Sequence, residues 1–140
     1  MRLLTPLLVS LLLALPHIVL AAESSGQKAV TQQRASNASL SALGVKALSA
    51  QGVKLLDVRS DGEWKAGHIA GAEHAYWVSI AGKTEQLWPD KSTPIVTYCA
   101  VGVRARAAAA RLRAAGYTHV LAMNDGGYED LIKAGLAKTP

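Results

Sequence analysis

The strongest structural signal in this chain of 140 residues is PIVTYCAVGVRARAAAARLRAAG, at residues 94–116. Its first part, PIVTY at residues 94–98, is compact, apolar and β-branched, which predicts a buried strand. After six further residues comes ARAAAARLRAA at residues 105–115, whose seven alanines and three arginines are strong helix formers. Gly116 stands where that helix should end. A strand that passes through a tight loop into a helix is the building unit of α/β folds.

The sequence on either side continues the alternation of strands and helices. Three more segments have the character of short strands: residues 53–58 (VKLLDV), 72–77 and 118–122. Three more helices are predicted, each bounded by a cap or a glycine: residues 40–50, 60–66 and 128–134. Residues 79–90 show no clear pattern. The alternation predicts an α/β domain with a mostly parallel central sheet flanked by helices.

Residues 1–21 have the layout of a secretory signal peptide. A positive charge at Arg2 precedes an almost wholly apolar run over residues 3–15, and small residues around Ala21 offer a cleavage point. An uncleaved anchor is the less favoured alternative, because this run is short for a membrane core of about 30 Å. Residues 22–38 are predicted to be a flexible leader, and residues 39–140 a single domain. We therefore expect an exported protein, periplasmic if the source is a Gram-negative bacterium.

Charge and cysteine content narrow the possible functions. Loss of residues 1–21 removes Arg2 from the 15 basic residues and none of the 10 acids, and the resulting net charge of +4 favours anionic ligands. Nucleic acid is a poor candidate, because the basic residues are not interleaved with aromatic ones. Cys99 is the only cysteine, so no disulfide can form within the chain. His74 and His119 are too dispersed to suggest a metal site.

The loop at residues 99–104 gathers the features of an anion site around a nucleophile. Ligands of α/β sheets bind beyond the carboxyl ends of the strands, and the start of the following helix offers free N–H groups. Gly102 permits backbone angles that other residues avoid, and Arg104 adds a permanent charge. In this setting we expect Cys99 to be largely a thiolate that attacks an anionic substrate, and not an inert buried thiol.

The chain resembles the rhodanese family of sulfurtransferases over about residues 40–136. Four segments carry the resemblance: LDVR at 56–59, EWKAGHIAGA at 63–72, YCAVGVR at 98–104 and DGGY at 125–128. The loop has four residues between its Cys and Arg, as in the members that transfer sulfur, whereas related phosphatases and arsenate reductases have five. Two positions depart from the family: Ala105 stands where Ser or Thr is common, and Tyr128 is the only aromatic residue near the late Gly-Gly turn.

The resemblance implies a reaction in two halves. Cys99 takes the outer sulfur of a donor such as thiosulfate as a persulfide, and a thiophilic acceptor, cyanide or a thiol, then removes it. The backbone N–H groups of five residues would hold the negative charge: Ala100, Val101, Gly102, Val103 and Arg104. Asp57 and Arg59 are expected to be a supporting pair. His68 is interpreted as a hydrogen-bonded turn residue in preference to an acid–base catalyst. The resemblance implies no metal and no organic cofactor.

The sequence leaves three functions open. The first is an enzyme that turns over with small acceptors, the second a carrier that passes its persulfide sulfur to a protein, and the third a binding or sensor module without turnover. The intact Cys99, Gly102 and Arg104 argue against the third. Because the chain has no second cysteine, the acceptor must come from outside it.

Two basic stripes run along the helix that follows the loop. Arg104 and Arg111 lie seven residues apart, as do Arg106 and Arg113, so each pair shares one helix face. A solvated face is the simpler interpretation of both stripes, and a basic rim that steers anionic donors is the alternative.

Overall fold

Four parallel strands form the centre of the molecule, in the order β3-β1-β4-β5. The computed structural model describes residues 23–35 and 39–140. The strands are β1 (Lys54–Asp57), β3 (Glu73–His74), β4 (Ile95–Tyr98) and β5 (Val120–Ala122). A separate antiparallel pair joins β2 (His68–Ile69) to β6 (Lys138–Thr139). The parallel central sheet that the sequence predicts is therefore confirmed.

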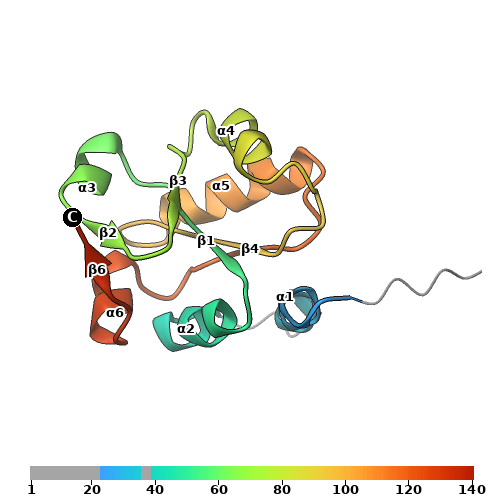
Figure 1. Cartoon of the computed structure of the whole chain (residues 1–140), viewed down its shortest axis with the longest axis horizontal. Coiled ribbons are helices and arrows are strands. Elements are labelled where there is room, and N and C mark those ends of the chain that lie inside the picture. The colour runs from blue at the N-terminus through green and yellow to red at the C-terminus, as the bar shows by residue number, and fades with distance from the viewer. Residues whose placement is uncertain (1–22, 36–38) are drawn as a thin grey trace, which may run out of the picture.

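Helices cover both faces of the sheet (Figure 1). On one face lie α1 (Ser25–Ala35), α2 (Ala42–Ala50) and α6 (Tyr128–Lys133), and on the other α4 (Ile80–Leu87) and α5 (Val103–Ala114). The short α3 (Asp61–Lys65) follows β1. All four residues of β4 are buried, as expected for a central parallel strand with both faces covered.

Alternate residues of the strands divide the core into two clusters. Leu55, Val96 and Leu121 face the cluster under α1, α2 and α6, whereas their neighbours Leu56, Ile95 and Val120 face α4 and α5. Cys99 and the fully buried Ala105 belong to the cluster on the α5 side. The sheet therefore holds the start of the loop at residues 99–104 against the helix that follows it.

Most elements predicted from the sequence are present. The capping box of Ser60 and Glu63 opens α3, and α2 ends at Ala50. The helix predicted from residue 105 begins two residues earlier, at Val103. The sequence did not predict α4, nor the two-residue strands β2 and β6, which pair with each other although they lie far apart in the chain.

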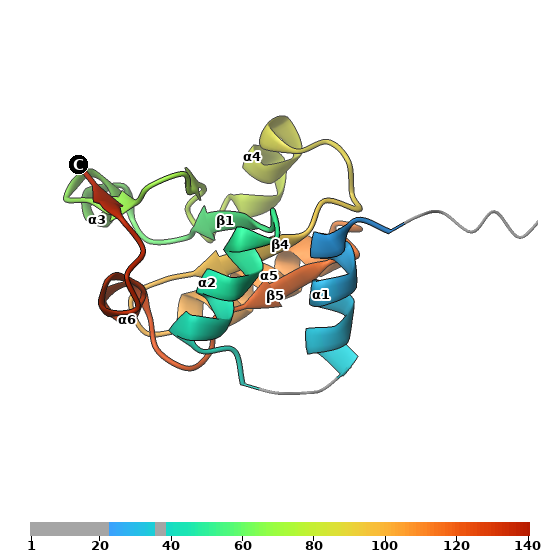
Figure 2. The same cartoon turned by 60° about the horizontal axis from the view of Figure 1, so that its bottom comes forward.

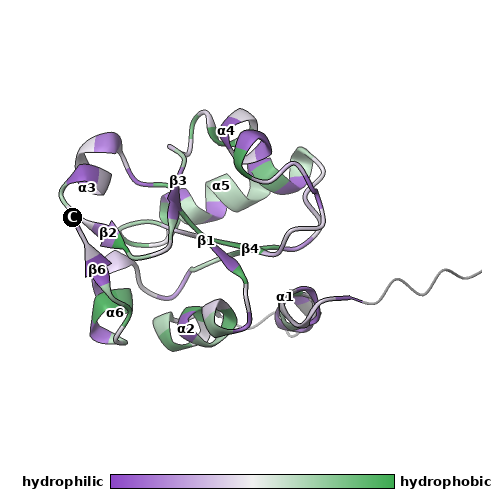
Figure 3. Cartoon of the chain, in the orientation of Figure 1, coloured by the Kyte–Doolittle hydropathy of each residue, from purple (hydrophilic) through white to green (hydrophobic). Residues whose placement is uncertain are grey.

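The prediction of a flexible leader over residues 22–38 is wrong where the structure describes it. Residues Ser25–Ala35 form α1, which packs beside α2 and β5 (Figure 2). The helix is largely hydrophilic (Figure 3), so its sequence has no apolar period, and it is anchored by the fully buried Val30. Gln27 adds a hydrogen bond from Nε2 to the carbonyl of Ser92, 2.9 Å long.

The predicted signal peptide, residues 1–21, lies outside the described residues. Within the described ranges, no helix has the length and apolar character needed to cross a membrane.

Candidate active site

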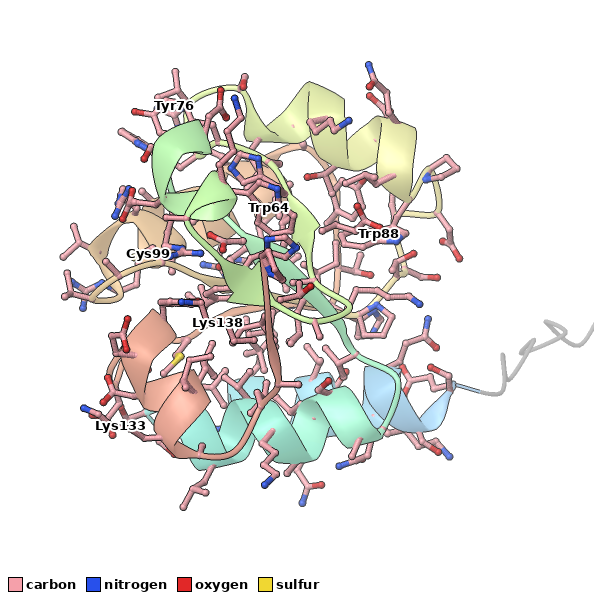
Figure 4. The ribbon with its side chains drawn as sticks, turned by 60° about the vertical axis from the view of Figure 1, so that its left-hand side comes forward. Trp64, Tyr76, Trp88, Cys99, Lys133 and Lys138 are labelled. Atoms are coloured by element: carbon pink, nitrogen blue, oxygen red, sulfur yellow. The ribbon has the colours of Figure 1, made fainter. Side chains whose placement is uncertain are left out.

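Cys99 lies directly after β4 and begins the loop that leads into α5. Its side chain is almost fully buried, with 1% of its surface exposed, and Sγ accepts a hydrogen bond from the Gly102 N–H at 3.1 Å. Figure 4 labels Cys99 on the side of the molecule where α3 and α6 also lie. Of the five residues predicted to bind the sulfur anion (residues 100–104), Gly102 is the one whose N–H contacts Sγ.

Gly102 has the backbone conformation that the sequence predicts for it. Its φ of +88° lies in the left-handed region that favours glycine, and it stands directly before the first residue of α5. A Cβ at this position would also lie 3.2 Å from the carbonyl oxygen of Met123 and 3.3 Å from Cα of Asn124. Both backbone angle and space therefore require glycine at the turn that brings an N–H group to Cys99.

The late Gly-Gly turn packs directly on the active-site loop. A Cβ at Gly127 would collide with the carbonyl of Ala100 and lie 2.8 Å from the carbonyl oxygen of Cys99. The next residue, Tyr128, donates its N–H to that Cys99 carbonyl at 2.9 Å. Sequence reasoning assigned no contact to this turn, because the two segments are distant in the sequence and only the fold joins them.

Arg104 does not point freely into solvent, because Glu63 holds its guanidinium group. The two terminal nitrogens of Arg104 donate to the two carboxylate oxygens of Glu63 at 2.7 and 2.9 Å. These bonds, helped by bonds from Ser60, hold the pKa of Glu63 at about 2. The same bonds raise the pKa of Arg104, against the opposing effect of its partial burial. Glu63 therefore has two roles. It caps α3, as the sequence predicts, and it binds Arg104, which the sequence did not predict.

Asp57 and Arg59 are paired with each other, and their supporting role for the loop stays a prediction. Arg59 donates to the two carboxylate oxygens of Asp57 at 2.7 to 3.0 Å, and both side chains are buried. Burial opposes the charge of Arg59, but the hydrogen bonds and charge of Asp57 outweigh it and raise the pKa of Arg59. Arg59 also donates to the Gly67 carbonyl at 2.8 Å and lies 3.8 Å from the centre of the Tyr128 ring. The pair therefore contacts Tyr128, whose N–H donates to the carbonyl of Cys99.

His68 is the first residue of β2, shortly after α3, and is stacked on an aromatic ring. Its ring centre lies 3.4 Å from that of Trp64, and Nδ1 lies 3.2 Å from the Trp64 carbonyl oxygen. Within the described residues, no hydrogen bond joins His68 to the loop at residues 99–104. The hydrogen bond to the Trp64 backbone is as expected, but the prediction of a turn is wrong, because His68 pairs with Thr139 as the first residue of β2.

A cavity of about 370 Å³ opens beside the loop at Ala100. The residues that line it include Arg59, Glu63, Gly67, Tyr128 and Lys138. The Tyr128 hydroxyl is buried and makes no hydrogen bond to any described residue. Lys138 comes from β6 at the end of the chain, and its side chain crosses over Gly67. The cavity therefore combines cationic and anionic groups next to the residue that follows Cys99.

The fold and the Cys99 loop define the class to which the protein belongs. Residues 40–134 match the family described as rhodanese-like domain, and the chain belongs to that family. It is 36% identical over 84 residues to the thiosulfate sulfurtransferase GlpE of Pseudomonas fluorescens, a match that covers 60% of this chain and 74% of the relative. The GlpE protein of Pseudomonas entomophila is 35% identical over 83 residues, covering 59% of this chain and 73% of the relative.

Solved structures agree with this assignment. The rhodanese-like domain of the Alr3790 protein from Anabaena superposes with a TM-score of 0.57 at 28% identity, covering 62% of this chain and 80% of that one. A rhodanese-related protein from Thermoplasma volcanium gives a TM-score of 0.60 at 25% identity, covering 72% of this chain and 96% of that one. The resemblance drawn from the four sequence segments is therefore confirmed.

Proposed function

We propose that this protein is a thiosulfate-type sulfurtransferase that carries sulfur as a persulfide on Cys99. The observation that supports this most is the position of Sγ at the start of α5, where the Gly102 N–H donates to it. Relatives named thiosulfate sulfurtransferase are 36% and 35% identical to this chain over the matched segments, which supports the same reaction class. The specific donor and acceptor are part of the proposal.

In the first half-reaction, the Cys99 thiolate attacks the outer sulfur of thiosulfate. A new S–S bond forms between Sγ and that sulfur, and the S–S bond within thiosulfate breaks. The electron pair of the broken bond leaves with sulfite, and the negative charge of the thiolate passes to the outer sulfur of the persulfide. The N–H groups at the start of α5 stabilise this charge without rearrangement, as preorganised donors do in other active sites.

In the second half-reaction, an external acceptor such as cyanide attacks the outer sulfur. The acceptor–sulfur bond forms, the persulfide S–S bond breaks, and the electron pair returns to Sγ as the thiolate. Thiocyanate leaves and the enzyme is regenerated, so the protein undergoes no net oxidation. Burial of Cys99 limits the access of water, and the cavity beside Ala100 gives space for the donor and acceptor.

A persulfide carrier is the second candidate, and one feature of the loop favours it. Val101 and Val103 expose 71% and 59% of their surfaces on either side of Gly102. Apolar side chains exposed next to a reactive residue are suited to contact with a protein acceptor. In this alternative the first half-reaction is the same, and the sulfur leaves only to a partner protein.

Intact-mass measurement before and after thiosulfate tests the proposal, with Cys99→Ala as the matched control. We expect a gain of one sulfur atom that the control lacks, followed by thiocyanate on addition of cyanide. A persulfide that forms but resists cyanide, and leaves only to a protein, would identify the carrier. No gain of mass by a folded and reduced protein would overturn the thiosulfate reaction.

We also propose that the protein is exported after cleavage of residues 1–21. The apolar run and the small residues near Ala21 support this, and α1 begins at Ser25, so cleavage leaves every described element intact. N-terminal sequencing of the protein from an extracytoplasmic fraction should begin at Ala22 or at a position next to it. A protein that keeps Met1 and stays inside the cell would overturn the proposal.

A further inference from the structure

A groove of about 470 Å³ borders the free edge of the sheet, at β5. α1 lies on one side of this edge strand and α5 on the other (Figure 2). Three arginines line the groove, Arg34 from α1 and both Arg106 and Arg113 from α5. The basic stripe of Arg106 and Arg113 therefore does not simply face solvent, because Arg34 of α1 lines the same groove.

No carboxylate pairs with any of these three arginines in the part of the chain that the structure describes. All ten acidic residues of the chain lie within that part, at residues 23–35 and 39–140. The other stripe differs, since Arg104 binds Glu63, and Arg111 lies 4.8 Å from the centre of the Trp77 ring and donates to the Val78 carbonyl. The two arginines of α5 that line the groove, Arg106 and Arg113, are therefore those of the helix without an anionic or aromatic partner among the described residues.

Two of the arginines are held in place by hydrogen bonds to the backbone near β5. Arg34 donates to the carbonyl of Thr118, and Arg113 donates to the carbonyl of Val120 at 3.0 Å. Each guanidinium group has five N–H donors, so most remain available to a ligand. Side chains anchored in this way lose less freedom when they bind, which favours affinity.

The two anchored cations also repel each other. Burial and the charge of Arg34 together lower the pKa of Arg113. An anion placed between them would relieve the repulsion and form charge-assisted hydrogen bonds with both guanidinium groups.

We propose that this groove is an anion site for a phosphate or sulfate group, either free or carried by an organic molecule. Planar guanidinium groups match the oxygens of such groups in pairs of parallel hydrogen bonds. The groove is larger than one inorganic anion, and Leu40 and Leu121 are among the residues that line it, so it has space for an organic part. The site does not include the loop at residues 99–104 and does not depend on sulfur transfer.

The alternative role for these arginines is to cover the edge strand. Unpaired strand edges invite pairing with other chains, and positively charged side chains prevent it. This role needs the two bonds to the Thr118 and Val120 carbonyls but no ligand, so it predicts no saturable binding.

Titration of the protein with inorganic phosphate, followed by amide NMR at constant ionic strength maintained with chloride, distinguishes the two. We expect saturable shifts at Leu121, Ala122 and Asn124. Arg113→Gln and Arg106→Gln should each weaken the apparent affinity about tenfold, as loss of a charge-assisted hydrogen bond does. The matched control is Arg111→Gln, which removes the same charge from the same helix and should change the affinity by less than about twofold.

Shifts confined to residues 99–104, shifts that never saturate, or equal losses in Arg111→Gln and Arg113→Gln would overturn the site. The Arg106 side chain makes no hydrogen bond or ion pair with the described residues, so its variant keeps the test valid if Arg113→Gln unfolds. The same titration with phenyl phosphate distinguishes a free anion from an organic phosphate as the ligand. Tighter binding than that of phosphate would indicate an organic ligand, and equal binding would indicate the free anion.

Discussion

Glu63 and Arg104, distant in the sequence, are joined by two parallel hydrogen bonds that tie the start of α3 to the start of α5. Arg104 lies in the first turn of α5, just after Gly102, whose N–H contacts the sulfur of Cys99. Arg104, which the sequence assigned to substrate binding, is therefore held by Glu63 of α3. The orientation of the Arg104 side chain depends on the ionisation of Glu63.

We expect Glu63→Gln to destabilise the protein in a manner that depends on pH. Folding lowers the pKa of Glu63 from about 4.5 to about 2, so its ionised form stabilises the folded state above pH 4.5. The difference in free energy of unfolding between wild type and variant should be full at about pH 6 and shrink as the pH falls toward about 2. Urea unfolding at several pH values measures it. Partial exposure and salt reduce its size.

The control for this experiment is Glu85→Gln. Glu85 pairs with Lys91 at 3.1 Å on the surface, where ion pairs contribute little. A wild-type advantage over Glu63→Gln that persisted unchanged at about pH 2 would contradict the assigned cause, because the carboxylate would then not be responsible.

We expect Asp57→Asn to cost about 3 kcal/mol of stability, because it leaves the buried Arg59 guanidinium without its counter-charge. Persulfide formation should also slow in the variant that stays folded, since Arg59 supports Tyr128 and thereby the Cys99 carbonyl. Urea unfolding and the rate of mass gain with thiosulfate give the two readouts. Asp61→Asn, at an exposed carboxylate, should change stability by less than about 0.5 kcal/mol. Equal effects of the two substitutions would show that the buried pair is not important for stability.

We expect Gly127→Ala to impair sulfur transfer more than folding. A methyl group there collides with the Ala100 carbonyl, so either the loop or the Gly-Gly turn must move away from its position. A displaced loop should lower kcat/KM by about 100-fold or more, because small shifts of reacting groups are costly. Gly82→Ala is the matched control, since nothing lies within 4 Å of its added Cβ. Normal turnover by a folded Gly127→Ala protein would disprove the role assigned to this contact.

The parts of the fold that the sequence predicts are those with local causes. The alanine-rich α5, the apolar β4 and the capping box of α3 each depend on residues within a few positions of one another. The position of Cys99 between β4 and α5 follows from the same local pattern. The roles in substrate binding of all five residues that follow Cys99, at 100–104, stay predictions.

The features that the sequence did not predict depend on contacts between residues that are distant in the sequence. The Glu63–Arg104 pair and the Gly127–Ala100 contact arise only when the sheet brings separate loops to one end. β2 and β6 are very short and carry no local pattern. The helix α4 contains Gly82 and the β-branched Thr84, which weaken its signal, and Ile80 and Thr84 are buried where it packs beside α5.

The clearest failure of sequence reasoning, α1, leads to a further prediction. Its hydrophilic sequence hides the fully buried side chain of Val30, which joins the cluster of α2, β1 and β4. We expect Val30→Ala to cost about 2 kcal/mol of stability, through lost burial and the cavity left behind. Thr31→Ala, at the exposed neighbour on the same helix, should change stability by less than about 0.5 kcal/mol. If both variants unfold at the same urea concentration as the wild type, burial of Val30 does not stabilise the domain, and the anchoring role assigned to this side chain is wrong.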